Sequence, residues 1–143
     1  MDTIKKRQEE IIEEFAMLDG DMEMTLDYIM ELGDELGAFP EAARIDDNIV
    51  KGCQSKVWMT AELDNDRVQF KADSNTAITK GLMSLLVRVL NQSPPQHVID
   101  AEIYFPRQIG MDRFIGTQRS NGFAAMIKQM KMYALALSAK QES

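Results

Sequence analysis

The chain has 143 residues and few of the residue types from which disulfide, zinc and redox sites are built. It contains one cysteine, one histidine and one tryptophan. A single cysteine excludes an intrachain disulfide and a CxxC redox pair. With only one histidine, a structural zinc site would need carboxylates to complete it. The lone cysteine, Cys53, is therefore the residue whose presence has to be explained.

Long apolar segments are missing as well. No segment approaches the roughly 20 apolar residues that a membrane span needs. The N-terminal sequence MDTIKKRQEE has no apolar stretch of signal-peptide length. We therefore expect a cytoplasmic protein that does not enter a membrane and whose cysteine stays reduced.

Positive charge is in deficit, with 16 Lys and Arg against 23 Asp and Glu and a net charge of −7. This balance argues against a nucleic-acid partner, because phosphates attract basic surfaces. Residues 1–73 hold 8 basic and 19 acidic side chains, whereas residues 74–143 hold 8 and 4. Two interpretations stay open: solvated helical faces of opposite sign, or faces that steer a protein partner.

The length and the apolar content of 45% suit one domain with one hydrophobic core. We predict a single domain over residues 1–143, with residues 139–143 as a flexible polar tail. The alternating segments VWMTAEL (57–63) and RVQFKAD (67–73) predict an antiparallel hairpin with one buried face. We expect residues 48–52 to add a short third strand.

Helical spacing of apolar residues recurs on both sides of the hairpin. It predicts helices over residues 3–18, between Asp21 and Gly37, from the cap Ser74 or Asn75 as far as Pro94, and from about Ser120 to the tail. Residues 95–119 are typical of loops with a short helix. The predicted fold class is α+β, a small three-stranded antiparallel sheet packed against several helices.

Cys53 lies in NIVKGCQSKVW (48–58), just ahead of the first strand. One interpretation is a packed, inert thiol, because cysteine is among the most buried residue types. The neighbours favour another, because they are small or polar and follow no apolar period: Lys51, Gly52, Gln54, Ser55 and Lys56. Gly52 permits the backbone of an exposed loop tip, and nearby cations favour the thiolate, which is the reactive form.

A single activated thiol limits the possible reactions. A Cys/His hydrolase needs a histidine base, and His97 in SPPQHVID is typical of a surface residue after a proline turn. A redox enzyme would lack its resolving thiol. What remains is a carrier, a thiol that accepts a group from one protein and passes it to another.

Four segments of the sequence resemble, in the same order, motifs of the SufE-type sulfur-acceptor family. They are VKGCQSKVW (50–58), LDYIMELGDELGAFPEAAR (26–44), FKADSNTAITKGLMSLLVRVLNQSPPQHVI (70–99) and IGMDRFIGTQRSNGFAAMIKQMK (109–131). The segment at 26–44 comes first in the chain, and together they cover most of it. The resemblance implies a fold with a three-stranded antiparallel sheet and helices around it.

The resemblance also implies a partner and a role. Proteins of this family take sulfur from a pyridoxal-phosphate-dependent cysteine desulfurase, which holds it as a persulfide. They stimulate that enzyme and pass the sulfur to an iron–sulfur cluster scaffold or another downstream acceptor. By its place in the motif, Cys53 is the persulfide acceptor here. The pyridoxal phosphate belongs to the partner, so we expect this chain to bind no cofactor and no metal.

Further candidate residues follow from the same motifs. The loop that would support the acceptor cysteine consists of Lys51, Gly52, Gln54 and Ser55. The candidates for contacts with the thiolate or with the partner are Asp73, Arg119 and Asn121. The alternative function is a non-catalytic adaptor, which activates a desulfurase by docking and in which Cys53 is not a carrier.

Arg119 itself allows two interpretations. Many family members have a proline shortly before this arginine, where this chain reads GTQR (116–119). Either Arg119 lies beside the Cys53 loop, where it favours the thiolate or contacts the desulfurase, or it is solvated while Ser120 or Asn121 caps the last helix.

A carrier cysteine must reach a cysteine inside another protein's active site, so access limits the exchange as much as thiolate content does. We hypothesise that the Cys53 loop has two positions. In one the thiol turns inward and is protected from oxidation, and in the other it is presented to the partner.

Overall fold

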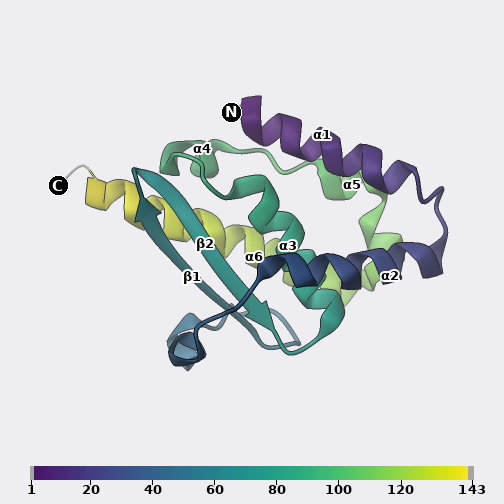
Figure 1. Cartoon of the computed structure of the whole chain (residues 1–143), viewed down its shortest axis with the longest axis horizontal. Helices are drawn as coiled ribbons and strands as arrows, with labels where there is room; N and C mark the ends of the chain where they lie inside the picture. Colours follow the sequence, from purple (N-terminus) through teal and green to yellow (C-terminus); the bar gives the residue numbers. More distant parts are fainter. Residues whose placement is uncertain (1, 142–143) are drawn as a thin grey trace.

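The computed structural model describes residues 2–141 as a mixed structure in which helices predominate (Figure 1). The elements are α1 (Asp2–Ala16), α2 (Met22–Leu32), β1 (Val57–Asp64), β2 (Arg67–Ser74), α3 (Ala77–Leu90), α4 (Pro95–Asp100), α5 (Phe105–Ile109) and α6 (Met111–Gln141). Short 3₁₀ turns lie between α2 and β1, at Gly33–Leu36, Glu41–Ala43 and Asp46–Asn48. The predicted α+β class is confirmed.

β1 and β2 form the predicted hairpin and pair in antiparallel register along their whole length. The turn residues Asn65 and Asp66 have φ values of 52° and 64°, as in the two-residue turns that match the twist of the strands. The alternation correctly predicts the buried face, which consists of Val57, Met59, Val68, Phe70 and Ala72. This face packs against α3 and α6.

Residues 48–52 do not form the third strand that the sequence led us to expect. Ile49 makes a single bridge to Trp58, and the Val50 N–H donates to the Val57 carbonyl at 2.8 Å. Pairing stops there because the chain turns at Gly52, whose φ of 97° lies outside the strand region. In the described part of the chain the sheet therefore has two strands.

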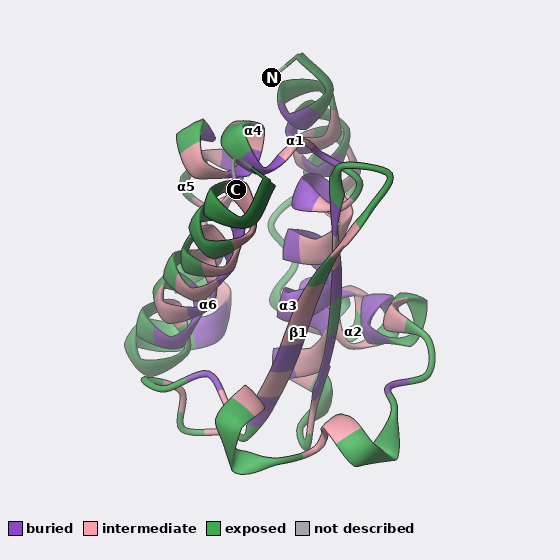
Figure 2. Cartoon of the chain, turned by 90° about the vertical axis from the view of Figure 1, so that its left-hand side faces the viewer, coloured by how far each residue is buried: buried purple, intermediate pink, exposed green. Residues whose placement is uncertain are grey.

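α3 is the central helix of the fold. Nine of its 14 residues are buried, as expected for a helix that other elements enclose. Figure 2 shows it behind the hairpin, with α6 on one side and α2 on the other. The contact with α2 is closest at Gly81, where a Cβ atom would lie 1.8 Å from the carbonyl oxygen of Ile29.

α6 begins earlier than the sequence predicts. The expected start is near Ser120, whereas α6 begins at Met111 and is interrupted at Gly116, which has a φ of 81° and a ψ of 169°. The interruption hides the helix in the sequence because it cuts the apolar period into short pieces. At the other end, residues 139–141 belong to α6 rather than to a tail. The other two tail residues, 142 and 143, lie outside the described residues.

The close contact between α2 and α3 at Gly81 leads to a prediction about the stability of the fold. Gly81→Ala should lower the free energy of unfolding by about 3 kcal/mol or more, because backbone rather than a flexible side chain blocks the new methyl group. Urea unfolding measures this change. The exposed substitution Lys5→Ala on α1 is the control and should stay within about 0.5 kcal/mol. Equal stabilities of the two variants would contradict the close contact.

Candidate functional site

Cys53 lies on the loop formed by residues 51–56, which joins the Ile49 bridge to β1. The loop lies on α6, and a Cβ atom at Gly52 would be 3.1 Å from the Cβ of Ala125. Both the positive φ and this contact favour glycine at position 52. The sequence correctly predicts that Cys53 sits on a loop ahead of the hairpin.

The thiol of Cys53 is half-buried and points at α6. It donates a hydrogen bond to the carbonyl oxygen of Gly122, with an Sγ–O distance of 3.4 Å. Burial raises the pKa of the Cys53 thiol above its ordinary value. Lys51 and Lys56 are exposed and do not line the space around the sulfur, so their cations do not activate the thiol in this conformation.

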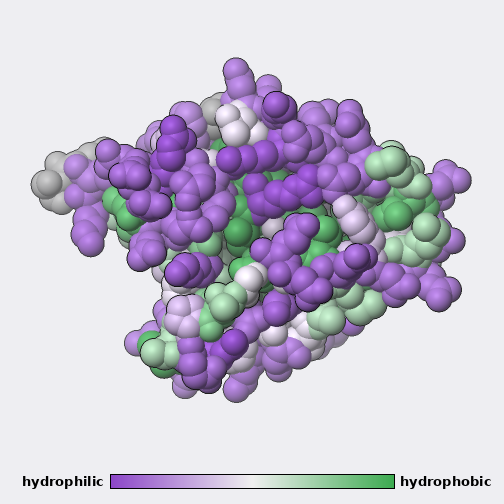
Figure 3. Space-filling model, viewed as in Figure 1, coloured by the Kyte–Doolittle hydropathy of each residue, from purple (hydrophilic) through white to green (hydrophobic). Residues whose placement is uncertain are grey.

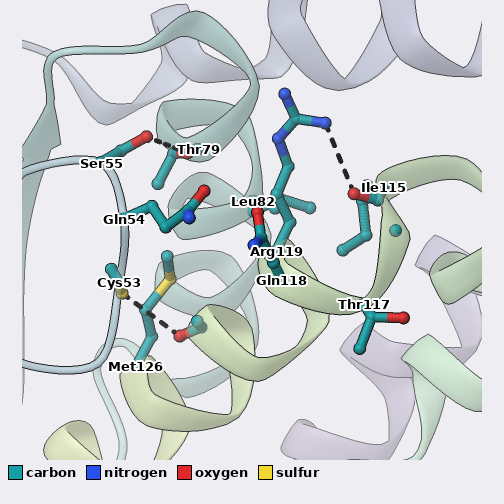
Figure 4. A pocket seen from close by; sticks show the side chains of 12 residues that line it. Cys53, Gln54, Ser55, Thr79, Leu82, Ile115, Thr117, Gln118, Arg119 and Met126 are labelled. Carbon is teal, nitrogen blue, oxygen red and sulfur yellow. Dashed lines mark hydrogen bonds between the residues drawn. The ribbon is translucent and has the colours of Figure 1, made fainter.

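The thiol borders a pocket of about 360 Å³ between the loop, α3 and α6 (Figure 4). Its apolar wall consists of Leu82, Ile115 and Met126. Its polar wall consists of Gln54, Ser55, Thr79, Thr117, Gln118 and Arg119. The lining contains one cation, no carboxylate and no histidine, so no side chain in the pocket is an evident general base.

Hydrogen bonds hold the far end of the loop to the junction of β2 and α3. The Ser55 hydroxyl accepts from the hydroxyls of Thr76 and Thr79 at 3.1 Å and 3.3 Å. Two hydrogen bonds join Lys56 and Asn75. Lys56 N donates to Asn75 Oδ1 at 3.1 Å, and Asn75 N donates to Lys56 O at 3.2 Å. Asn75 therefore holds the loop. The sequence suggested Ser74 or Asn75 as the cap of α3, but the N-cap position is Thr76.

Arg119 lines the same pocket as Cys53, and this is the placement that the resemblance implies. Figure 4 shows its guanidinium directed away from the thiol, toward the interruption in α6, where it donates to the carbonyl of Ile115 at 3.4 Å. The competing interpretation agrees with the structure in one part, because Arg119 is exposed. Its other part, a cap at Ser120 or Asn121, is wrong because both residues lie inside α6. Asn121 is exposed and does not line the pocket.

Asp73 does not contact the thiol in this conformation. Its carboxylate is bonded to the guanidinium of Arg44 and lies 3.5 Å from the ammonium of Lys80. Burial is the largest single effect and would raise the pKa of the Asp73 carboxyl. The hydrogen bonds from Arg44 and from the Ser74 backbone, together with the charges of Arg44 and Lys80, outweigh it and hold the pKa below its ordinary value. Arg44 also lies 5.5 Å from the ring centroid of Trp58, so this cluster fastens the segment before the loop to the hairpin.

The sequence reasoning did not identify several residues of the pocket. Thr79, Leu82 and Met126 lie on helices, and their apolar period predicts only that they face inward. Thr79 is 5% exposed, and a polar side chain on an otherwise apolar stripe was a signal that could have marked it. Gly122 supplies the carbonyl to the thiol, and nothing in the sequence distinguishes that carbonyl from its neighbours.

The described part of the chain holds neither a metal-binding cluster nor a membrane-spanning helix. Within residues 2–141, no three His, Cys, Asp or Glu side chains lie close enough together to hold a metal ion. Among the helices of this region, none is both long and apolar enough to cross a bilayer.

Burial of the thiol makes a prediction about its reactivity. Because burial raises the pKa of Cys53, alkylation by iodoacetamide should show its inflection at a higher pH than the value of about 8.5 typical of an exposed cysteine. The folded chain is compared with the same chain unfolded in urea, across the alkaline range. An inflection at or below that of the unfolded chain would contradict the inward position of the thiol.

Comparison with known proteins identifies the family. The family described as "SufE: Fe-S metabolism associated domain" matches residues 9–134. A SufE-like protein of Rhizobium meliloti (strain 1021), itself uncharacterized, is 32% identical over 132 residues, which cover 88% of this chain and 93% of that protein. The fold is similar to the solution structure of a hypothetical protein from Thermus thermophilus, with a TM-score of 0.76, 17% identity and coverage of 93% of this chain and 96% of the other. The chain therefore belongs to the SufE family.

Proposed function

We propose that this chain carries sulfur on Cys53. It accepts persulfide sulfur from a pyridoxal-phosphate-dependent cysteine desulfurase in the cytoplasm, stimulates that enzyme and passes the sulfur toward iron–sulfur cluster assembly. The observation that carries the proposal is the lone thiol on a loop at a pocket without a general base. Membership of a family associated with Fe–S metabolism supports the same role.

The transfer needs only the chemistry of thiol exchange. The Cys53 thiolate attacks the terminal sulfur of the donor's persulfide and forms a new S–S bond. The bond between that sulfur and the donor's own Sγ breaks, and the donor cysteine leaves as a thiolate. The proton lost by Cys53 balances the proton that this thiolate takes up. No oxidant, reductant or cofactor on this chain enters the step, and the pyridoxal phosphate belongs to the desulfurase.

The conformation in hand supports the inward position of a two-position loop. The thiol is bonded to Gly122 and its pKa is raised, so it stays protonated and reacts slowly with oxidants. Attack on a persulfide in another protein requires Cys53 to leave this contact and enter water or the donor's active site. In this proposal the end of the loop moves with its tip, so the bonds at Ser55 and Asn75 also favour the inward position.

The pocket also offers space for the product of the transfer. Its volume of about 360 Å³ is several times the roughly 30 Å³ that one water molecule occupies in the liquid. An additional sulfur on Cys53 can therefore turn inward with the thiol, against the apolar side chains of Leu82 and Met126. This arrangement would shield a persulfide between loading and delivery.

Cys53→Ser distinguishes a carrier from an adaptor. With a cysteine desulfurase and L-cysteine, the variant should bind no sulfur and should lose the stimulation of desulfurase turnover, because it lacks the accepting thiol. Sulfide release and labelled sulfur on the chain measure the two effects. Lys6→Ala, exposed on α1 and outside the pocket lining, keeps the thiol and should retain sulfur acceptance. Full stimulation by Cys53→Ser would favour the adaptor.

Asn75→Ala tests the attachment of the loop. Losing its side-chain bond to the loop should cost about 1 kcal/mol and raise the rate of Cys53 alkylation at neutral pH about fivefold. Asn121→Ala is the matched control, because Asn121 is exposed on α6 and does not line the thiol pocket. Equal alkylation rates in the two variants would show that Asn75 does not hold the loop closed.

A further inference from the structure

The long helix α6 is interrupted at Gly116, and this interruption lies in the wall of the thiol pocket. Gly116 has a φ of 81° and a ψ of 169°, a backbone conformation that is essentially restricted to glycine. A Cβ atom at this position would meet no atom within 4 Å. The backbone conformation, and not a lack of space, therefore requires glycine at position 116.

The interruption changes which residues of α6 line the pocket. In a regular helix each residue is turned by about 100° from the one before it, so one face carries residues spaced by three or four positions. The pocket residues of α6 that follow this spacing are Ile115, Arg119, Gly122 and Met126. Gly116 and Thr117 line the pocket as well, although a regular helix would turn them about 100° and 200° away from Ile115. The break therefore adds a stretch of wall that a straight α6 would not supply.

The added wall lies across the pocket from the Cys53 loop, as Figure 4 shows for the chain between Ile115 and Arg119. Buried side chains fix it on both sides, because Ile115 before the break is 3% exposed and Phe123 after it is 4% exposed. The guanidinium of Arg119 spans the break by donating to the carbonyl of Ile115 at 3.4 Å. These contacts hold the wall in one position relative to the thiol.

A closed pocket gives a sulfur atom on Cys53 an apolar shelter. Most of the surface in the view of Figure 3 is hydrophilic, whereas the thiol pocket has an apolar wall of Leu82, Ile115 and Met126. A persulfide that turns into this pocket is shielded from thiols in solution only while the side opposite the loop stays closed. The interrupted stretch of α6 forms that side.

We propose that Gly116 is a positioning residue of the sulfur carrier, whose backbone conformation wraps α6 around the thiol pocket and so shields the sulfur held on Cys53. This assignment rests on the proposed function. Gly116 has no side chain and acts through the wall that it shapes. Alanine can keep this conformation only with strain, and helical angles relieve the strain by continuing α6 through residue 116 and turning Thr117 out of the wall.

Gly37 offers a matched control. Its φ of 72° and ψ of −166° lie in the same region as those of Gly116, both residues are exposed, and a Cβ atom at either would meet nothing within 4 Å. Gly37 follows the 3₁₀ turn at Gly33–Leu36 and does not line the thiol pocket. Alanine therefore introduces a similar backbone strain at both positions, but only Gly116→Ala alters the wall.

The first measurement is alkylation of Cys53 by iodoacetamide as a function of pH, together with urea unfolding of each variant. Gly116→Ala should raise the alkylation rate at neutral pH about fivefold and move the inflection to lower pH, because a thiol that has lost one pocket wall is less desolvated. Gly37→Ala should lose a similar amount of stability and alkylate like the unmodified chain. Equal alkylation of the two variants would show that the break only connects two helices, and would overturn the proposal.

The second measurement uses chains loaded with sulfur by a cysteine desulfurase and L-cysteine and then separated from both. Dithiothreitol, a small thiol, attacks the terminal sulfur of the persulfide, the S–S bond to Cys53 breaks, and Cys53 leaves as a thiolate. Gly116→Ala should lose its sulfur about fivefold faster than the unmodified chain, because access limits this exchange. Gly37→Ala should lose it at the unmodified rate. Equal rates in all three chains would overturn the shielding role.

A second pair of variants covers the case in which Gly116→Ala does not fold. Asparagine reaches positive φ more readily than alanine does, so Gly116→Asn should fold and show both increases in smaller measure, with Gly37→Asn as its control. Unchanged rates in Gly116→Asn would then overturn the proposal. If the unmodified chain accepts no sulfur, the proposed function and the shielding role fail together, while the alkylation comparison still decides whether Gly116 positions the wall.

Discussion

The packing of the Cys53 loop on α6 is the contact from which the properties of the site follow. Gly52 turns the chain at a φ of 97° and lies against Ala125, and the adjacent thiol meets the carbonyl of Gly122. A side chain at position 52 would crowd Ala125 and strain the turn. The same turn ends the pairing of residues 49 and 50 with β1, so the short sheet and the position of the thiol have one cause.

This contact imposes opposite demands on the thiol. Burial raises the pKa of Cys53 and so lowers its thiolate content, which protects a lone cysteine in the resting chain. Sulfur exchange requires the opposite, a solvated thiolate that reaches another protein. A loop fastened at Ser55 and Asn75 and weakly bonded at its tip reconciles the two, because a docked partner can replace the single Sγ–carbonyl contact.

Sequence patterns correctly predicted those features of the fold that depend on residues close together in the chain. Alternation fixed the buried face of the hairpin, and the polar neighbours of Cys53 indicated a loop. The prediction of a third strand was wrong. Residues 48–50 are extended, but their sequence does not show that the chain turns away at Gly52. The pocket walls from Thr79, Ile115 and Met126 depend on how helices distant in sequence meet, which periodicity does not encode. The sequence left two positions open for Arg119, and only the structure shows an exposed side chain that borders the pocket and bonds to Ile115.

The central claim is that sulfur resides on Cys53 during transfer. Intact-protein mass spectrometry, after mixing the chain with a cysteine desulfurase and L-cysteine without reductant, measures this directly, and peptide mapping locates the adduct. The account predicts a gain of one or more sulfur atoms, confined to the peptide that contains Cys53 and removed by reductant. An unmodified Cys53 in a mixture where the desulfurase turns over would contradict it.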